Sequence, residues 1–274
     1  MLCAAETHPS AAAELLLVVE AGNTTTSLLV FQGTQLLDAR KVLSQILHTN
    51  EGCSAALDPL LSAYSALCHA GLCSVVPELE QRVGEYLRAH LSGKVMKVSA
   101  ALSLPFTLNY DSPDSFGADR IALCALCAQC YPEKAVIALD VGTAITVDVL
   151  AANQHYLGGM IMPGLDLMAK ALHNHTAKLP LVLLQQPATL LGCSTEDGIR
   201  NGILHGCASS LDGLIVKITR WLEEEHQERD VQVMLTGGNA PLLARMLECT
   251  SVLDELAVAK GTRYLFALNT SLNV

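Results

Sequence analysis

The sequence is short of basic residues: 17 Lys and Arg stand against 27 Asp and Glu among 274 residues, which gives a formal net charge of −10. Nucleic acids and anionic membranes bind basic surfaces, so this deficit argues against either of them as a main partner. It leaves anionic small molecules open, because a few local cations and backbone N–H groups are enough to bind a phosphate. The hydrophobic content of 51% is ample for a packed core.

Long uncharged apolar runs are also missing. No stretch is long enough and free enough of charge to cross a bilayer. The first 21 residues contain no Lys or Arg, and their short apolar run ends in Glu20 and is needed as a strand, so we predict no signal peptide. Single cysteines scattered along a chain without a secretion signal are typical of a reducing compartment, and we expect a cytoplasmic protein.

Two groups of potential metal ligands lack a complete ligand set. Cys124, Cys127 and Cys130 form a C-x2-C-x2-C pattern, but Tyr131 and Pro132 follow where an iron–sulfur site would need a fourth ligand. Their spacing in an alanine- and leucine-rich run predicts core thiols along one face of a helix. The "HNH" at 173–175 has no third ligand nearby and is predicted to be a helix end and loop.

The sequence does contain a repeated pattern. "LLLVVEAGNTTTSLLVF" (15–31) consists of an apolar run, a carboxylate, a glycine, polar residues and a second apolar run, and alone it would predict only a β-hairpin. "AVIALDVGTAITVDVL" (135–150) repeats this plan, and a third apolar run follows each copy. The repeat therefore predicts two similar half-domains. With an offset of 120 residues, the matched pairs are Glu20 with Asp140, Gly22 with Gly142, Asn23 with Thr143, and Thr26 with Thr146.

The periodicity of apolar residues predicts the order β-β-β-α-β-α, twice. In the first half it predicts strands at about 14–20, 26–32 and 35–43, then a helix within 53–69, a strand near "CSVV", a helix from Pro77 to about Leu91, and a strand in "KVMKVSA". A helix that ends near Gln129 leads to the second half, where "TEDGIRNGILHG" opens a helix and "VQVML" is a strand.

The two hairpin turns are suited to holding phosphate. Backbone N–H groups at Gly22 and Gly142 are open to close approach, threonine hydroxyls donate to phosphate oxygens, and carboxylates hold cations or their waters. We therefore predict a polyphosphate held by the turns in the space between the halves. A P-loop kinase is not indicated, because "SGKV" at Ser92 lacks the glycine spacing and hydroxyl of that motif.

Seven motifs in order along the chain carry a resemblance to a known family: "EAGNTTTS", "CSVVP", "YDSPDSFGADR", "DVGTAITVDV", "GGMIMPG", "STEDGIRNG" and "TGGNA". With them the chain resembles the actin, sugar-kinase and heat-shock ATPase superfamily, and more narrowly the type III pantothenate kinases. The resemblance implies an α/β fold of two actin-like (ribonuclease H-like) half-domains, each a mixed five-stranded sheet with helices, with a cleft between them. It implies boundaries at 1–117 and 118–274, the second half beginning with the connecting helix.

The same resemblance implies ATP-dependent phosphorylation of pantothenate to 4'-phosphopantothenate, the first step of coenzyme A biosynthesis, by a homodimer. Asp119 would be the base that accepts the proton of the pantothenate hydroxyl. Read from the residues alone, Asp119 is a helix N-terminal acid with an ordinary ion pair, and Thr195 is a helix N-cap followed by Glu196 and Asp197. The residues that would hold pantothenate are Tyr110, Gly117, Ala118, Asp119, Arg120 and Thr195.

On the nucleotide side, the resemblance implies that Asp140 binds a monovalent cation, K⁺ or NH₄⁺, and that Glu20 holds the Mg²⁺ of MgATP through water. The residues that would line the nucleotide are Glu20, Ala21, Gly22, Asn23, Thr24, Thr25, Thr26, Ser27, Thr143, Thr236, Gly237 and Gly238.

Glu20 departs from the family pattern, which has aspartate at this position. Its carboxylate lies one methylene further from the backbone, and a displacement of about 1 Å at a reacting centre can cost about a hundredfold in rate. Two alternatives stay open: a weakly active or inactive homologue that acts as a regulator, for which Glu20 is the argument, and a phosphohydrolase of the same superfamily, such as an exopolyphosphatase, which would not need the segment from Tyr110 to Arg120.

Overall fold

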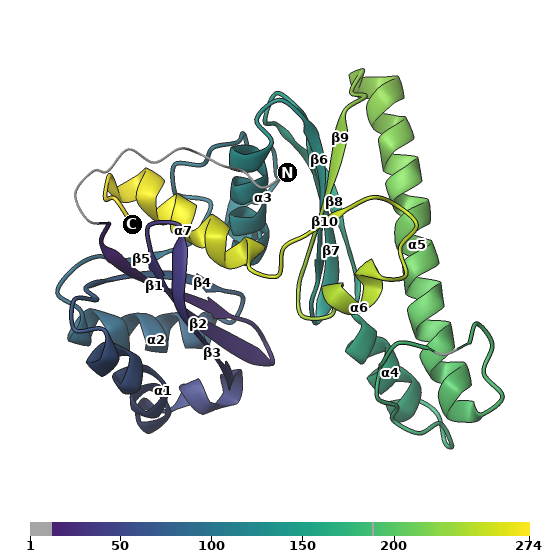
Figure 1. The fold of residues 1–274 in the computed structure, drawn as a ribbon, viewed down its shortest axis with the longest axis horizontal. Helices are drawn as coiled ribbons and strands as arrows, with labels where there is room; N and C mark the ends of the chain where they lie inside the picture. Colours follow the sequence, from purple (N-terminus) through teal and green to yellow (C-terminus); the bar gives the residue numbers. More distant parts are fainter. Residues whose placement is uncertain (1–12, 188) are drawn as a thin grey trace. The chain divides into compact units, whose positions relative to one another are not determined.

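A computed structural model describes residues 13–187 and 189–274, which fold into two compact units (Figure 1). The first unit comprises the chain up to Cys130 together with Ala257–Val274, and the second comprises Tyr131–Leu256. Residues 1–12, part of the segment for which we predict no signal peptide, lie outside the described residues. Among the described helices, none is long and apolar enough to cross a bilayer.

The first unit is built on a five-stranded sheet with the order β3-β2-β1-β4-β5. β1 and β2 form an antiparallel hairpin, β3 extends it, and β4 and β5 join in parallel on the other side of β1. The strands are β1 (Leu15–Ala21), β2 (Thr25–Gln32), β3 (Gln35–Leu43), β4 (His69–Ser74) and β5 (Val95–Lys97). The helices are α1 (Asn50–Ala63), α2 (Pro77–His90), α3 (Ala118–Cys130) and α7 (Ala257–Thr270), with short 3-10 turns at Ser44–His48 and Pro113–Ser115.

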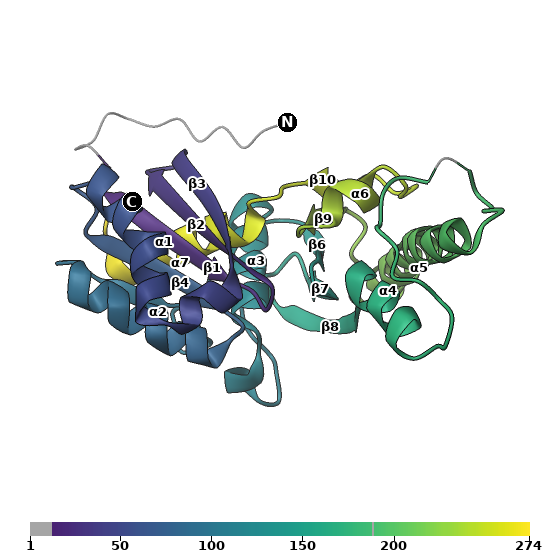
Figure 2. The same cartoon turned by 90° about the horizontal axis from the view of Figure 1, so that it is seen from below.

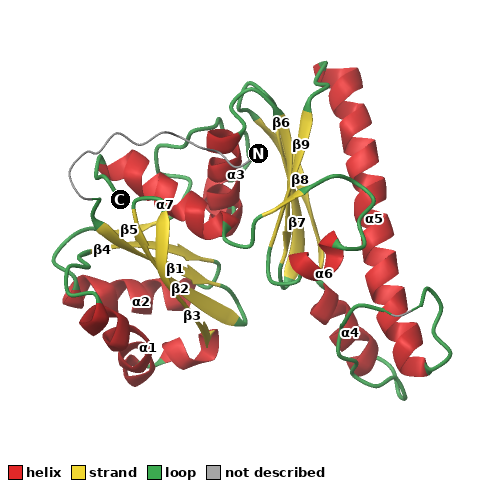
Figure 3. Ribbon diagram, viewed as in Figure 1, coloured by secondary structure: helices red, strands yellow, loops and turns green. Residues whose placement is uncertain are grey.

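The second unit repeats this architecture. Its sheet has the order β10-β9-β6-β7-β8, with an antiparallel meander of three strands and two parallel strands beside it (Figure 3). The strands are β6 (Ala135–Val141), β7 (Ala144–Leu150), β8 (Tyr156–Pro163), β9 (Val231–Thr236) and β10 (Val252–Leu253). The helices are α4 (Leu165–Asn174), α5 (Thr195–His226) and α6 (Ala240–Ala244). The expected pair of mixed five-stranded half-domains is confirmed.

Helices cover the first sheet on both faces. On one face, alternate residues such as Leu17 and Val19 form a core with buried residues of α1 and α2. On the other face lie α3 and α7, which appear side by side in Figures 1 and 2. A Cβ on Gly261 of α7 would lie 1.9 Å from the carbonyl oxygen of Ala122 in α3, so only glycine permits this approach. In the second unit, α4 and α5 bury their apolar side chains against β6 and β7.

The pairing of α3 with α7 divides the chain differently from the expected boundaries of 1–117 and 118–274. α3 does not begin the second unit, and α7 returns to the first unit from the far end of the sequence. The physical reason is that α3 is buried along nearly its whole length by partners of the first unit, including Cys124 and Cys127. This burial agrees with their prediction as core thiols.

The two hairpins match in plan but not in length. Gly22 N–H donates to the carbonyl of Thr25 (3.0 Å), whereas Gly142 N–H donates to that of Ala144 (3.0 Å), so the second turn is one residue shorter. Consequently Glu20 is paired with Ser27, and Asp140 is paired with Thr146. The offset of 120 residues between the two halves is therefore correct as far as Gly22 and Gly142. The predicted match of Thr26 with Thr146 is wrong, because Thr146 is paired with the carboxylate residue of its hairpin, as Ser27 is in the first.

Candidate active site

The first turn is held in shape by a residue that the sequence patterns do not single out, Ser44. Its hydroxyl donates to the carbonyl of Gly22 (2.6 Å) and pairs with the hydroxyl of Thr26 (2.9 Å), and its N–H donates to the carbonyl of Thr24 (3.0 Å). Asn23 and Thr24 are left exposed at the tip. The turn is therefore fixed from below while the side chains at its tip stay accessible. The N–H of Gly22, which was expected to face phosphate, is used instead by the bond to Thr25 within the turn.

Two of the expected nucleotide residues support the site from within. Thr26 is fully buried and its hydroxyl faces Ser44. Ala21 is buried as well, and its carbonyl accepts from Val75 N–H at 3.1 Å. Both hold the end of the hairpin in place, so we remove their side chains from the set expected to touch phosphate. Gly22, Asn23, Thr24, Thr25 and Ser27 keep some exposure.

Glu20 lies at the end of β1 and remains partly exposed. Burial raises the pKa of its carboxyl from 4.5 to about 7, the charge of Lys41 opposes that shift, and the charge of Asp119 adds to it. Lys41 of β3 lies in the same row across the sheet as Glu20 of β1, because Glu20 is paired with Ser27 of β2 and Ser27 is paired with Lys41. The interaction with Asp119 shows that the two carboxyls expected at the site lie in one electrostatic environment.

Asp119 lies in the first turn of α3, as the helix-acid interpretation predicted. Its Oδ1 accepts from the N–H of Arg120 at 2.8 Å, and the carboxyl group stays partly exposed. Gly117 comes just before the helix, and a Cβ there would lie 2.5 Å from Asp119 Oδ1. Gly117 is thus required for the position of this carboxylate, while Ala118 is buried as the first residue of the helix.

An aromatic side chain links Arg120 to Tyr110. The guanidinium carbon of Arg120 lies 4.3 Å from the ring centroid of Phe116 and 6.0 Å from that of Tyr110. The two rings meet edge to face at 4.9 Å. Arg120 and Phe116 are buried, whereas Tyr110 is 38% exposed. Phe116 was not among the residues predicted for the site, although it stands inside the "SFGADR" segment and contacts both neighbours.

In the second unit, Asp140 is partly buried at the end of β6, beside β9 and β7. Gly237 adopts a φ of +100°, and a Cβ there would lie 2.3 Å from Asp140 Oδ1. The hydroxyl of Thr146, the residue paired with Asp140, is buried and has no hydrogen-bond partner among the described residues. A carboxylate beside an unsatisfied hydroxyl is an oxygen donor set that suits a hard cation.

The remaining expected residues of the second unit differ in exposure. Thr143 and Gly238 are exposed, whereas Thr236 is buried at the end of β9. Thr195 is exposed and is the first residue of α5, but it is not the N-cap. The cap is Ser194, whose hydroxyl accepts from Asp197 N–H at 3.1 Å. The expectation of a Thr195 cap is corrected by one residue, which leaves its hydroxyl clear of that capping bond.

The part of the chain that the structure describes also holds a group of three potential metal ligands: Glu14, Cys68 and His69. His69 Nδ1 accepts from the N–H of Lys94 at 2.9 Å, and Nε2 lies 2.6 Å from Glu14 Oε2. Since Nδ1 uses its lone pair, the ring proton of a neutral histidine must be on Nε2, where it donates to Glu14. Nε2 then has no lone pair for a metal. This group is therefore a hydrogen-bonded link and not a metal site.

Comparisons with known proteins agree with this arrangement. The family model for type III pantothenate kinase matches residues 16–217. A type III pantothenate kinase from Chlorobium luteolum is 48% identical over 262 residues, which cover 96% of each chain. A solved structure from Campylobacter jejuni, named as a Baf family transcriptional activator, has a TM-score of 0.57 at 19% identity and covers 93% of this chain and 100% of its own. One from Sinorhizobium meliloti, named as a 2-dehydro-3-deoxygalactonokinase protein, has a TM-score of 0.56 at 12% identity and covers 94% and 100%.

Proposed function

This chain belongs to the type III pantothenate kinase family, and from that premise we propose how its residues phosphorylate pantothenate with ATP. The product is 4'-phosphopantothenate, formed in the first step of coenzyme A biosynthesis. The observation that supports the proposal is that the charge of Asp119 contributes to the raised pKa of Glu20, so the expected base and the expected metal-side carboxyl influence each other within the first unit.

In the proposed mechanism, Asp119 accepts the proton of the primary hydroxyl of pantothenate as that oxygen attacks the γ-phosphorus of ATP. The new O–P bond forms, the bond from the γ-phosphorus to the bridging oxygen breaks, and ADP leaves. Arg120, fixed over Phe116, and Tyr110 orient the pantothenate, with Thr195 as a further contact. Gly117 leaves the space in which the Asp119 carboxylate sits.

On the nucleotide side, the exposed turn at Asn23 and Thr24 and the hydroxyls of Thr25 and Ser27 bind the phosphates in this proposal. Gly22 leaves room for their approach, because its own N–H is held by Thr25. A divalent ion that arrives with ATP would offset the charge of the phosphates. Glu20 would hold its waters, and the carboxyl must release its proton to do so because its pKa is about 7. Thr143, Gly237 and Gly238 would be further contacts of the nucleotide.

The reaction class is tested by the dependence of ADP release on pantothenate. We expect the pure protein to release ADP from MgATP only when pantothenate is present. ADP release that is equally fast without pantothenate would instead indicate a phosphohydrolase, and no release in either condition would indicate a binding protein.

We further propose that a monovalent cation binds at Asp140 and activates the enzyme. Asp140 and the unsatisfied hydroxyl of Thr146 supply the oxygen ligands. A cation bound there would supply positive charge for the triphosphate of ATP, which this protein cannot bind through a P-loop lysine because the sequence lacks that motif. Replacing K⁺ by tetramethylammonium should lower the rate about tenfold, and Thr146→Val should weaken the activation by K⁺. Equal rates in the two salts would contradict the proposal.

We also propose that the chain forms a homodimer through the second unit. Met160 of β8 and Trp221 of α5 are exposed and line a cavity of about 340 Å³, and the exposed Ile161 and Val216 lie on the same two elements. Exposed apolar patches mark protein–protein contacts. Sedimentation velocity should give twice the chain mass of 29.1 kDa. Trp221→Glu should shift the species toward the monomer, and Leu268→Glu, at a similarly exposed site in the first unit, should not. A wild-type monomer would contradict the proposal.

A further inference from the structure

The segment of residues 181–187 and 189–194, which we name the strap, lies between α4 and Thr195 in the chain. It forms no helix or strand, so its backbone carbonyls find no partners in a ladder and must be satisfied in another way. Four of its leucines are highly exposed, with fractions from 54% to 81%, and so do little to hold it in place. They are Leu181, Leu183, Leu190 and Leu191.

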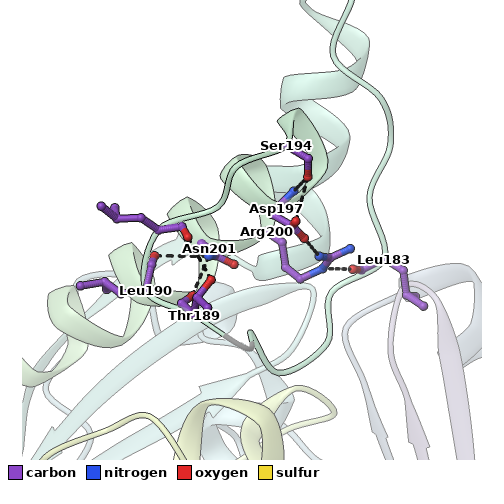
Figure 4. Close-up of polar contacts among 8 residues, drawn as sticks. Leu183, Thr189, Leu190, Ser194, Asp197, Arg200 and Asn201 are labelled. Carbon is purple, nitrogen blue, oxygen red and sulfur yellow. Dashed lines mark hydrogen bonds and ion pairs between the residues drawn. The ribbon is translucent and has the colours of Figure 1, made fainter.

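Arg200 of α5 connects the strap to the start of that helix (Figure 4). Its Nε donates to the carbonyl of Leu183 at 3.0 Å, and its Nη1 pairs with the carboxylate of Asp197. Asp197 in turn donates its N–H to the Ser194 hydroxyl at 3.1 Å and accepts from that hydroxyl at 2.8 Å. A continuous set of polar contacts thus runs from the beginning of the strap, at Leu183, to the residue that precedes Thr195.

The next residue of the helix, Asn201, holds the strap a second time. Its side chain is 6% exposed, and its Nδ2 donates to the carbonyls of Thr189 (2.7 Å) and Leu190 (3.3 Å). Both hydrogens of the amide are used by these two bonds. Gly192 adds close packing, because a Cβ there would lie 2.4 Å from the Cβ of Asp197. The side chains of Arg200 and Asn201 therefore donate hydrogen bonds to three backbone carbonyls of the strap, which belongs to no β-sheet.

We propose that Arg200 and Asn201 are positioning residues for pantothenate, which act through the strap and the Ser194 cap on Thr195. The inference rests on the proposed function, in which Thr195 contacts pantothenate. If the strap is already ordered in the free enzyme, the free energy of pantothenate binding includes no cost for ordering it. If the strap is released, it must be ordered each time pantothenate binds, and the lost conformational entropy weakens binding. The cost falls on the KM for pantothenate. The KM for ATP and the chemical step do not depend on the strap.

Steady-state kinetics of Arg200→Ala and Asn201→Ala test this inference. We expect the KM for pantothenate to rise about tenfold in each variant, with kcat and the KM for ATP within about twofold of wild type. Arg220→Ala, which removes an exposed arginine from the same helix, should change none of the three. Because the two residues act through Thr195, adding Thr195→Ala to either variant should raise the KM no further than Thr195→Ala alone.

Hydrogen exchange gives a readout that does not depend on activity. The amides of the strap should exchange faster in both variants than in wild type, while those of β6 and β9 keep their protection. Wild-type exchange rates in the strap, an unchanged KM for pantothenate, or a parallel rise in both KM values would each overturn the positioning role. Absence of phosphopantothenate formation by the wild-type protein would instead overturn the proposed function and this inference with it.

Discussion

Replacement of Asp119 by asparagine is expected to lower kcat for pantothenate phosphorylation by about 10²- to 10⁴-fold, the range of a lost general base. Asparagine preserves the size of the side chain and can still accept the hydrogen bond from Arg120 N–H, so α3 should begin as before. The amide cannot take the proton of the attacking hydroxyl. Rates of phosphopantothenate formation, together with nucleotide affinity measured by calorimetry, check both halves of this expectation.

A second variant displaces the same carboxylate without neutralising it. In Gly117→Ala the new methyl group would lie 2.5 Å from Asp119 Oδ1, so the carboxylate must move. We expect a loss of about a hundredfold, since a displacement of about 1 Å at a reacting centre has that effect. Gly206→Ala is the matched control, because its methyl group would meet no atom within 4 Å.

For the first variant, near-normal turnover in Asp119→Asn would show that Asp119 takes no part in the mechanism.

Replacement of Glu20 by glutamine is expected to remove most of the activity, by about a hundredfold, because the charge that holds the metal and its waters is lost. Glu20→Asp separates two views of the longer side chain. If glutamate pushes the metal outward, the shorter residue raises kcat or lowers the Mg²⁺ requirement. If the site has adjusted around glutamate, shortening opens a gap and lowers kcat. A Mg²⁺ titration of both variants decides, and a fully active Glu20→Gln would reduce Glu20 to a strand-end residue.

The same variant reports on the charge of Glu20 through folding. The carboxyl has a pKa of about 7 in the folded chain against 4.5 ordinarily, so between these values the folded chain keeps a proton that the unfolded chain has lost. The free energy of unfolding therefore falls as the pH rises from 4.5 to 7. The full difference is about 3 kcal/mol, and partial exposure of the side chain reduces our expectation to about 2 kcal/mol. Urea unfolding without Mg²⁺ or nucleotide should show Glu20→Gln gaining this amount over wild type between pH 4.5 and 8.

The repeated hairpins could be predicted because their signal is local. An apolar run, a carboxylate, a glycine and a second apolar run specify two strands and the turn that joins them, and the observed β1, β2 and β3 match the predicted strands within about one residue. The length of the second turn could not be read in the same way. Both turns close on a glycine, and only the backbone bonds to Thr25 and Ala144 show that one turn is shorter.

Features that depend on distant segments were missed for a physical reason. Ser44 supports a turn 22 residues earlier in the chain, and Lys41 influences Glu20 only because three strands align in register. Nothing in the local sequence around either residue encodes those contacts. Phe116 is different, since it lies within a segment already considered, and an aromatic residue three positions before the helix acid was a signal that could have been used.

The division of the chain shows the same limit. α7 follows the second unit directly in sequence but packs on α3, and the contact that allows this is the close approach of Gly261 to Ala122. A glycine within a helix indicates close packing without indicating the partner. The family resemblance identified the kind of half-domain correctly. The assignment of α3 and α7 to the first unit could be made only from their contacts in three dimensions.

Transfer of the γ-phosphoryl group of ATP onto the primary hydroxyl of pantothenate is the reaction on which these expectations depend. Its most direct test is ³¹P NMR of a single reaction that contains the purified protein, MgATP, K⁺ and pantothenate. We expect the γ-phosphate resonance of ATP to be replaced, mole for mole with ADP, by the resonance of a phosphate monoester that mass spectrometry identifies as 4'-phosphopantothenate. Growth of the inorganic phosphate resonance in its place, or an unchanged ATP spectrum, would show that the chain does not carry out this transfer.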